Sequence, residues 1–370
     1  MIQSFIPLSE KITFHAYSSR LQNVREFIRR KEIKGFLITD LDNVRYLTGF
    51  TGSSGVFLIT EKKTFFLTDF RYKEQAEKEV KEGDIVITKG DIIKTIRSLS
   101  KKAALKSLGF ETSIPYASYR KLSKMDLQLK PYYSVIEKLR AIKDDLEVQS
   151  IKEAVRRAEN SFLQVRPYIK RGMRERAIAL RLEERLKKNG CRHIPFDIIV
   201  ASGPHSAMPH AKSTERKIEK GDLIIIDWGG EANSYFSDMT RTLVVRGNGI
   251  SQKKKIYKLV FLANKKALAN VLPGRRSKDV DFSAREVIKN AGYSQYFGHA
   301  TGHGVGLQIH ELPRITWNKN DIIQENMIFT IEPGIYMPGI GGVRIEDMVI
   351  VKPVKPVVLT TLPKKLDIIS

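Results

Sequence analysis

The sequence predicts two domains: an α/β domain at the N-terminus, followed by an α+β domain built on a mostly antiparallel curved sheet. The length, 370 residues, is sufficient for two domains. In residues 1–137, short β-branched and aromatic runs alternate with runs whose apolar residues recur at helical spacing. In residues 138–370, two long helical patterns come first and strand patterns dominate afterwards. We therefore place the domain boundary between residues 137 and 138.

The elements expected in the first domain are short and separated by glycines. Strands are expected at residues 35–40, 54–60, 63–69 and 84–89, and helices at residues 20–32, 71–82, 91–103 and 116–125. No cluster of histidine, cysteine and carboxylate residues occurs among them. The first domain is therefore assigned no chemistry.

The second domain begins with helical patterns after Asp144 and Asp145, which are suitable helix N-caps. The helices expected are residues 146–169, 174–190, 253–272 and 283–292, with Gly190 ending the second. Strands are expected at residues 196–202, 222–229, 234–245, 327–336 and 342–351. Helices packed on an antiparallel sheet are the architecture that this order predicts.

The composition excludes several classes of protein. No run of about 18 apolar residues is present, so no membrane span is expected. The first twenty residues lack the basic and apolar regions of a signal peptide, and the single cysteine, Cys191, cannot form an internal disulfide. Both features predict a cytoplasmic protein. The net charge of +23 comes from basic residues mixed with acidic ones, which predicts a solvated surface and no specific nucleic-acid or membrane partner.

Four carboxylates in apolar surroundings are the first chemical signal. Asp227 follows Ile224–Ile226, Asp238 lies on the next predicted strand, and Glu332 and Glu346 lie in the apolar runs IFTIEPG and GVRIEDMVIV. Buried carboxylates repel one another and are costly unless cations separate them. A hairpin would place the two aspartates on one face. We interpret the set as ligands for divalent metal ions.

Histidines are the second signal, because six of the seven lie between residues 193 and 310. His303 lies in GHATGHGVGLQIHE, where the glycines indicate a close backbone approach. Four carboxylates and one imidazole can hold two metal ions about 3.5 Å apart, which can share a hydroxide and polarise a carbonyl group. This is the outline of a metallohydrolase.

At this point the chain resembles the pita-bread metallopeptidases and, within them, the Xaa-Pro peptidases, aminopeptidase P and prolidase. The blocks VASGPHSAMPHA, DWG, SDMTRT, HGVG, EPGIY and VRIED follow the order found in that family. DNVRYLTGFTGSSG is similar to the creatinase-type N-terminal domain. The resemblance implies a noncatalytic creatinase-type domain over 1–137 and a pita-bread catalytic domain over 138–370. The chain departs from the family at Ser213, where relatives often have proline, and at the variable position His205.

The resemblance also implies roles for individual residues. The five metal ligands of the family fall on Asp227, Asp238, His303, Glu332 and Glu346. Asp238 and Glu346 would bridge the two ions, Asp227 would bind one of them in a bidentate manner, and His303 and Glu332 would complete the other. The remaining site residues implied are His210, His299 and His310 for substrate and proton transfer, and Tyr336 and Arg344 in support of the reaction centre.

In the mechanism that the family implies, a hydroxide shared by the metals attacks the carbonyl before proline. Glu332 would carry the proton, and His310, with His299, would stabilise the oxyanion or the leaving group. The family usually works with Mn²⁺ or Co²⁺; the oxygen-rich ligand set favours Mn²⁺, and Zn²⁺ is a further alternative. Proline-containing peptides are the substrates implied, and a homodimer is the assembly implied.

Three functional readings stay open at the level of sequence. The favoured one is an Xaa-Pro aminopeptidase, because the block from Phe196 to Ala211 is most similar to the short bacterial aminopeptidase P-like group. The alternative is an Xaa-Pro dipeptidase, that is, a prolidase. A pita-bread binding protein that has lost its metals is the third reading, and the presence of all five ligand residues argues against it.

Overall fold

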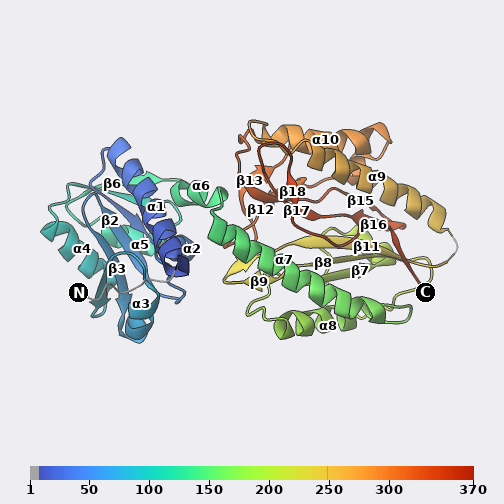
Figure 1. The fold of residues 1–370 in the computed structure, drawn as a ribbon, viewed down its shortest axis with the longest axis horizontal. Coiled ribbons are helices and arrows are strands. Elements are labelled where there is room, and N and C mark those ends of the chain that lie inside the picture. The colour runs from blue at the N-terminus through green and yellow to red at the C-terminus, as the bar shows by residue number, and fades with distance from the viewer. Residues whose placement is uncertain (1–7, 248) are drawn as a thin grey trace. The chain divides into compact units, whose positions relative to one another are not determined.

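The computed structural model describes residues 8–247 and 249–370, with side chains from residue 16 onwards, and it divides into two compact units (Figure 1). The first unit comprises residues 1–140 and the second comprises residues 141–370. Within the described part of the chain, no helix combines the length and the apolar character needed to cross a lipid bilayer.

The first unit is built on a six-stranded mixed sheet in the order β4-β3-β2-β1-β5-β6. Its strands are β1 (Gly35–Ile38), β2 (Val56–Thr60), β3 (Thr64–Asp69), β4 (Asp84–Thr88), β5 (Ser107–Glu111) and β6 (Gln128–Tyr132). β1 pairs antiparallel with β2 and parallel with β5. The α/β class predicted for this region is confirmed, and the sheet has two more strands, β5 and β6, than the sequence predicted.

The helices of the first unit are α1 (Leu8–Arg30), α2 (Leu41–Thr48), α3 (Lys73–Glu79), α4 (Ile92–Lys102), α5 (Tyr116–Leu122) and α6 (Val135–Ala141). Alternate strand residues bury opposite faces of the sheet. Leu37, Leu58 and Leu67 pack with Ile93 and Ile96 of α4 in one core cluster. Asp40 caps α2 by accepting hydrogen bonds from the backbone N–H groups of Asp42 and Asn43.

The second unit places its strands between two pairs of helices (Figure 1). Helices α7 (Asp145–Val165) and α8 (Glu175–Lys188) lie on one side, and α9 (Ile250–Ala269) and α10 (Ser277–Asn290) lie on the other. On the α7 side, Trp228 stacks on Phe162 and donates its indole N–H to the Ala158 carbonyl. On the α9 side, Val260 and Ala267 pack into a core with Phe329 and Val343.

Two larger sheets and two short ribbons make up the strand layer. One sheet has the order β19-β11-β8-β7 and the other has the order β13-β12-β14-β17-β18; β9 pairs with β10, and β15 pairs with β16. Among the described strands of the second unit, only β11 and β19 pair in parallel, so the mostly antiparallel sheet predicted for this region is confirmed. The strands are β7 (Ile199–Ser202), β8 (Leu223–Trp228), β9 (Glu231–Ala232), β10 (Tyr235–Phe236), β11 (Met239–Val245), β12 (Gly302–Gly304), β13 (Glu311–Ile315), β14 (Ile328–Ile331), β15 (Gly334–Met337), β16 (Gly341–Arg344), β17 (Asp347–Ile350), β18 (Val357–Val358) and β19 (Asp367–Ile369).

Three strands predicted as continuous are each broken in two. The run 234–245 forms β10 and β11, 327–336 forms β14 and β15, and 342–351 forms β16 and β17. Pro333 has no N–H to donate, which ends the ladder in the second run. The predicted helix 146–169 likewise ends at Val165, and Pro167 lies in the 3₁₀ turn that follows.

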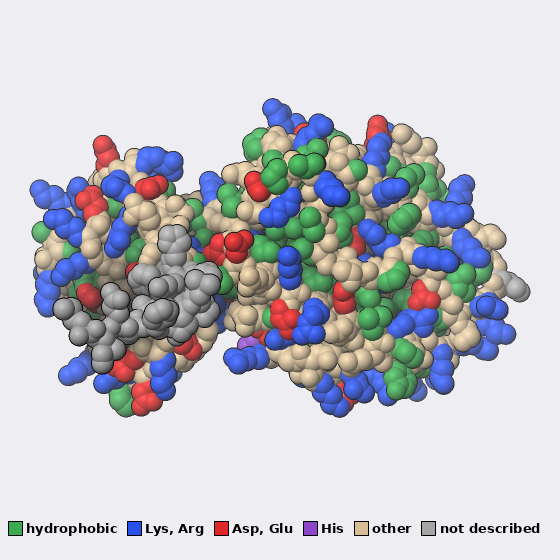
Figure 2. Space-filling model, in the orientation of Figure 1, with side chains coloured by type: hydrophobic (Ala, Val, Ile, Leu, Met, Phe, Trp, Pro, Cys, Tyr) green, Lys and Arg blue, Asp and Glu red, His purple; other side chains and the backbone are tan. Residues whose placement is uncertain are grey.

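Charged side chains of both signs lie on both units on the face that Figure 2 shows. Lysine and arginine side chains are scattered over the face shown in Figure 2, with aspartate and glutamate side chains among them. The one cysteine is buried: the Cys191 Sγ accepts a hydrogen bond from the Glu231 N–H at 3.3 Å. Burial raises the pKa of this thiol, so it stays protonated near neutral pH.

Candidate functional site

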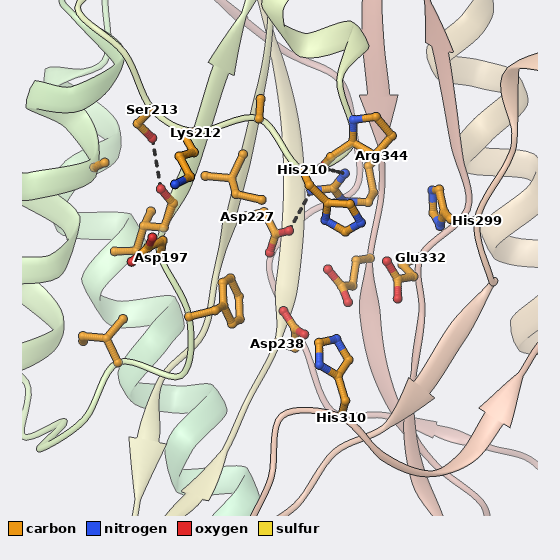
Figure 3. Close-up of a pocket in the computed structure, with 18 of the residues that line it drawn as sticks. Asp197, His210, Lys212, Ser213, Asp227, Asp238, His299, His310, Glu332 and Arg344 are labelled. Carbon is orange, nitrogen blue, oxygen red and sulfur yellow. Dashed lines mark hydrogen bonds and ion pairs between the residues drawn. The ribbon is translucent and has the colours of Figure 1, made fainter.

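A cavity of about 980 Å³ opens in the second unit, among the strands of its two larger sheets. Nine of the ten site residues predicted from the sequence line it, and several of them face one another across it in Figure 3. These nine are His210, Asp227, Asp238, His299, His303, His310, Glu332, Arg344 and Glu346. The tenth, Tyr336, lies behind the wall and is hydrogen-bonded to two of them.

The strand pair β8–β11 brings the two aspartates together. Asp227 lies opposite Thr240 in this antiparallel pair, and Asp238 lies just before β11, two residues from Thr240. Residues two apart on an extended chain point to the same face of a sheet. Both carboxylates therefore face the cavity, as the hairpin argument from the sequence predicts.

The two glutamates lie at strand breaks. Glu332 follows β14, and its N–H donates to the Thr301 carbonyl at 2.8 Å. Glu346 lies between β16 and β17, and its N–H donates to the Thr240 carbonyl at 3.2 Å, across to β11. Thr240 also donates its hydroxyl to Glu346 Oε2 at 2.7 Å. Interrupted pairing thus turns both carboxylates towards the aspartates.

His303 is held in β12 by glycines on both sides. A Cβ atom at Gly302 would lie 1.9 Å from the Thr330 carbonyl oxygen, and one at Gly304 would lie 2.0 Å from that of Leu312. The His303 Nδ1 lies 3.1 Å from the Gly304 carbonyl, which can only accept, so Nδ1 carries the proton and Nε2 keeps its lone pair. Nε2 lies 3.6 Å from Asp238 Oδ2 and 3.5 Å from Glu332 Oε1. Burial lowers the pKa of His303 to about 3, so the ring is neutral and can act as a metal ligand.

The carboxylates repel one another in this buried place. Burial, with the neighbouring carboxylates, raises the pKa of Asp238 and that of Glu346 well above the ordinary values. Burial also raises the pKa of Glu332 to about 7. The Oδ1 atom of Asp227 is buried and has no hydrogen-bond partner among the described residues. The cluster of four carboxylates therefore needs positive charge to balance it.

Divalent metal ions fit this donor set. Ligand atoms of Asp238, His303 and Glu346 lie within 4.8 Å of one another, and Asp227 and Glu332 face the same cavity. Cations would neutralise the excess of carboxylates and satisfy the orphaned oxygen of Asp227. Carboxylate oxygens with one imidazole are ligands for Mn²⁺, Co²⁺ or Zn²⁺, and no thiolate is near to select a softer ion.

A chain of hydrogen bonds joins Asp227 to the far wall of the cavity. Arg344 donates from Nη2 to Asp227 Oδ2 at 2.6 Å and from Nη1 to the Tyr336 hydroxyl oxygen at 2.8 Å. The Tyr336 hydroxyl in turn lies 3.0 Å from His299 Nε2. The ion pair of Arg344 is with Asp227.

The tautomer of His299 follows from its second contact. His299 Nδ1 lies 2.8 Å from the Ala300 carbonyl, so it must donate. Burial, with the charge of Arg344, lowers the pKa of His299 to about 4, and the ring is neutral near pH 7. Nε2 is then an acceptor, and the Tyr336 hydroxyl donates to it.

His310 and His210 occupy the open part of the cavity. His310 is exposed, and its ring centroid lies 4.3 Å from that of His303. Burial and the charge of Arg314 lower the pKa of His310, which favours a neutral ring able to donate one hydrogen bond. His210 is exposed and follows Pro209, whose carbonyl accepts a hydrogen bond from Arg344. The other histidines whose side chains are described, His193 and His205, do not line the cavity.

Other cavity residues escaped the sequence analysis. Arg314 is exposed at the cavity, opposite His303 in the β12–β13 pair, and no ion pair or hydrogen bond of its side chain is present among the described residues. Only the pairing register could have revealed it. Lys212 and Asp197 lie on the side of the cavity away from His299 and Glu332 (Figure 3). Ser213, where relatives often have proline, ties this side together by donating to the Ile198 carbonyl at 3.0 Å and accepting from the Val200 N–H at 2.8 Å.

Comparisons with known families match almost the whole chain. The model of metallopeptidase family M24 matches residues 149–353, and that of the creatinase/prolidase N-terminal domain matches residues 20–142. The first span contains all ten predicted site residues.

Individual relatives extend over both units. An Xaa-Pro dipeptidase of Pyrococcus horikoshii is 37% identical over 339 residues, which cover 90% of this chain and 94% of that protein. A solved Xaa-Pro dipeptidase from Bacillus anthracis is 38% identical with a TM-score of 0.92, covering 95% of this chain and 100% of the other. A solved X-Pro aminopeptidase from Thermotoga maritima is 34% identical with a TM-score of 0.86, covering 94% and 99%.

Proposed function

Because this chain belongs to metallopeptidase family M24, we propose that it hydrolyses the bond between an N-terminal residue and proline. The observation that carries the proposal is the convergence of four carboxylates and the neutral His303 on one cavity, where like charges lie buried. Relatives of both Xaa-Pro types cover at least 90% of the chain, which supports proline specificity.

Five residues would hold two divalent metal ions, with Mn²⁺ as the proposed occupant: Asp227, Asp238, His303, Glu332 and Glu346. Such ions, when bound, lower the pKa of a shared water and polarise the scissile carbonyl group. Arg344 and Thr240 keep Asp227 and Glu346 in place, through the contacts at 2.6 Å and 2.7 Å.

Glu332 is proposed to move the proton. Thr330 donates its hydroxyl to Glu332 Oε1 at 3.2 Å, and the same oxygen lies 3.5 Å from His303 Nε2, so the carboxyl group is held among the candidate metal ligands. Glu332 can therefore take a proton from the attacking water and deliver it to the proline nitrogen. That delivery is required because the nitrogen of an Xaa-Pro bond is a tertiary amide and a poor leaving group until it is protonated. His310, neutral and at the mouth, would donate to the carbonyl oxygen as negative charge develops on it.

His299 is assigned a different role from His310. Its proton points to the Ala300 carbonyl and its Nε2 accepts from Tyr336, so the ring orients the Tyr336–Arg344–Asp227 chain and has no proton to give a leaving group. We propose that the His299 and His210 rings form the wall against which the proline ring packs. An amide N–H at this position would face no acceptor provided for it.

The length of the substrate separates two candidate activities. The unpaired guanidinium of Arg314 at the cavity favours dipeptides, because a proline at the C-terminus carries a free carboxylate. The relatives of 37% and 38% identity described above carry the dipeptidase name. Aminopeptidase action on longer peptides is the second candidate, since a cavity of about 980 Å³ can hold more than a dipeptide.

The test of the proposed function compares matched peptides with Mn²⁺ supplied. We expect cleavage of Ala-Pro and of Ala-Pro-Ala to depend on the metal, and Ala-Ala-Ala to be cleaved with a kcat/KM at least about tenfold lower than Ala-Pro-Ala. Equal rates on the two tripeptides would end the Xaa-Pro assignment and leave a metallopeptidase of other specificity.

The Arg314→Met variant separates the two candidate activities. If Arg314 binds the proline carboxylate, this variant raises KM for Ala-Pro about tenfold and changes KM for Ala-Pro-Ala much less. An equal effect on both peptides would contradict that role. A wild-type preference for Ala-Pro-Ala over Ala-Pro would favour the aminopeptidase.

A further inference from the structure

An ion pair on α10 lies outside the cavity and behind His299. Asp281 is completely buried, and Arg285 binds it at two points, from Nε to Oδ2 and from Nη2 to Oδ1, both at 2.9 Å. Neither residue lines the cavity. A buried carboxylate with a bidentate guanidinium is costly to build unless the remaining hydrogen-bonding groups of both side chains find partners.

Those partners all belong to the short segment 297–301. Arg285 donates from Nη1 to the Phe297 carbonyl and from Nη2 to the His299 carbonyl, each at 2.9 Å. Thr301 donates its hydroxyl to Asp281 Oδ1 at 2.7 Å. The ion pair thus binds every second residue of this segment.

Two aromatic rings complete the enclosure of the guanidinium. The Arg285 Cζ lies 4.3 Å from the centroid of the Phe297 ring and 4.7 Å from that of Trp317. Phe297 also packs edge-to-face against the His299 ring, with centroids 5.1 Å apart. The guanidinium plane is therefore fixed by stacking as well as by hydrogen bonds.

Segment 297–301 has little other regular structure to hold it. It lies between a 3₁₀ turn that ends at Tyr296 and β12, which begins at Gly302. Yet it carries two connections of the site: His299 Nε2 to the Tyr336 hydroxyl at 3.0 Å, and the Thr301 carbonyl, which accepts from the Glu332 N–H at 2.8 Å. His303 follows two residues later. The position of this segment therefore sets the positions of one wall and one metal-ligand candidate.

We propose that Arg285, together with Asp281, is a positioning pair for the active site, which fixes His299 and Glu332 through the segment 297–301. The proposal rests on the proposed function for its effect on turnover, although the fixing of the segment can be measured without substrate. Lysine cannot replace arginine here, because a single ammonium group cannot bind a carboxylate at two points and also reach two carbonyls in a plane.

The decisive variant is Arg285→Lys, which keeps the positive charge beside Asp281 and removes the fork. We expect kcat on Ala-Pro to fall about tenfold or more, because small displacements of positioned groups are costly to turnover. KM should stay within about twofold and Mn²⁺ content should be unchanged, since the ligands remain. Hydrogen–deuterium exchange of the peptide spanning residues 297–304 should become faster.

Two matched controls belong to the same experiment. Arg156→Lys alters an exposed arginine that forms the same kind of two-point pair, with Glu153 on α7. Glu286→Gln alters α10 at the next position. Glu286 forms an exposed ion pair with Lys266 and makes no hydrogen bond to segment 297–301 among the described residues. Both controls should match the wild type in kcat and in exchange.

The outcomes are distinguishable. Wild-type exchange and wild-type kcat in Arg285→Lys overturn the proposal, and so does a loss of kcat that added Mn²⁺ restores. If wild-type protein cleaves no Xaa-Pro peptide, the proposed function fails, and the exchange measurement alone decides the positioning role.

Should Arg285→Lys not fold, Thr301→Val removes a single hydrogen bond to Asp281 at nearly constant shape. It must then show the same faster exchange, with a smaller fall in kcat, or the proposal is wrong.

Discussion

At the scale of single residues, Arg344 connects the charges of the cavity. It is buried and donates to Asp227, to the Tyr336 hydroxyl and to the Thr240 hydroxyl, which itself donates to Glu346. One guanidinium cannot balance four carboxylates, so the rest of the balance must come from bound cations. The charge state of each carboxylate in the cavity therefore depends on whether metal ions are bound.

Glu346→Gln is expected to abolish activity and leave the fold intact. The amide removes one negative charge from the ion site but still accepts the Thr240 hydroxyl, so the metal-free protein loses no stabilising contact. Activity should fall to about 1% or less, because the ions provide the nucleophile. Mass spectrometry of bound Mn²⁺ and steady-state kinetics check this, with the exposed Glu325→Gln as control. Full metal occupancy with normal turnover would refute the assignment of Glu346.

His310→Ala is expected to reduce turnover while Mn²⁺ stays bound. The ring lies beside His303 at the open side of the cavity, where it can donate to the substrate carbonyl oxygen. Loss of such a donor typically lowers kcat by about 10²–10³-fold. His193→Ala, an exposed histidine outside the cavity, serves as the control. If His310→Ala instead loses its metals and recovers full activity when they are resupplied, His310 is a ligand.

Residue types and their order were the predictable part of the site. Asp227, Glu332 and Glu346 each stand out as a charge inside an apolar run, and buried charge requires a partner. The partner of Arg344 could not be predicted, because it depends on how β16 meets β8 and β11. Arg314 was missed for the same reason: an arginine on a short strand is ordinary until the strand is paired with His303.

At the scale of elements, the segment that opens the second unit is joined to the loop that carries His310. Lys143 has no exposed side-chain surface, and its Nζ lies 3.3 Å from Glu311 Oε2. Glu311 Oε1 accepts from the Gln308 N–H at 2.9 Å. The Glu311 carboxylate thereby links the two ends of the turn, Gln308 and Glu311, between which His310 lies.

Lys143→Met is expected to destabilise the second unit by about 3–5 kcal/mol, because it removes the ammonium group beside a buried carboxylate. The double variant Lys143→Met/Glu311→Gln should recover part of that loss, since it removes the buried charge as well. Chemical denaturation monitored by tryptophan emission measures both. A change below about 0.5 kcal/mol in the single variant would show that the ion pair contributes nothing.

The breaks in the strands explain where element prediction failed. Apolar and β-branched residues lie on both sides of Glu332 and of Glu346, so composition predicts one strand in each place. In the folded chain, long-range contacts end the pairing: the Glu346 N–H turns to the Thr240 carbonyl of another sheet. Such contacts are set by tertiary structure and leave no local signature, apart from Pro333.

At the scale of the whole molecule, all ten site residues lie in the second unit, and each unit has its own core. We propose that the first unit takes no part in the chemistry. Both fold classes could be predicted, because each depends on a pattern that extends over a long stretch of sequence. Strand and helix patterns alternate in the first half, and helices precede strands in the second. The position of β6 could not, since the short, partly buried run Gln128–Tyr132 shows no clear period.

Metal removal should make the stability of the protein fall as pH rises. In the metal-free state, burial raises the pKa of Glu332 from 4.5 to about 7, and the pKa values of Asp238 and Glu346 are raised as well. The folded state then binds more protons than the unfolded state between these values, so the stability present below pH 4.5 is lost as pH rises through 7. For Glu332 alone the loss is on the order of 3 kcal/mol.

Thermal unfolding of EDTA-treated protein from pH 5 to 8 checks this expectation. The Mn²⁺-loaded protein should show a much flatter profile, because bound cations favour the ionised carboxylates at every pH in the range. A metal-free unfolding temperature that stays constant or rises over this range would contradict the account of the carboxylate cluster.

The buried thiol of Cys191 makes the protein a convenient object for site-specific labelling. The sequence contains one cysteine, it is 3% exposed, and its raised pKa keeps it protonated. Maleimide reagents should therefore leave the folded wild-type chain unmodified, so no existing thiol has to be removed before a new cysteine is introduced. Replacing Leu180 by cysteine would put a single reactive handle on α8, at the rim of the cavity, where a fluorophore could report peptide arrival in real time.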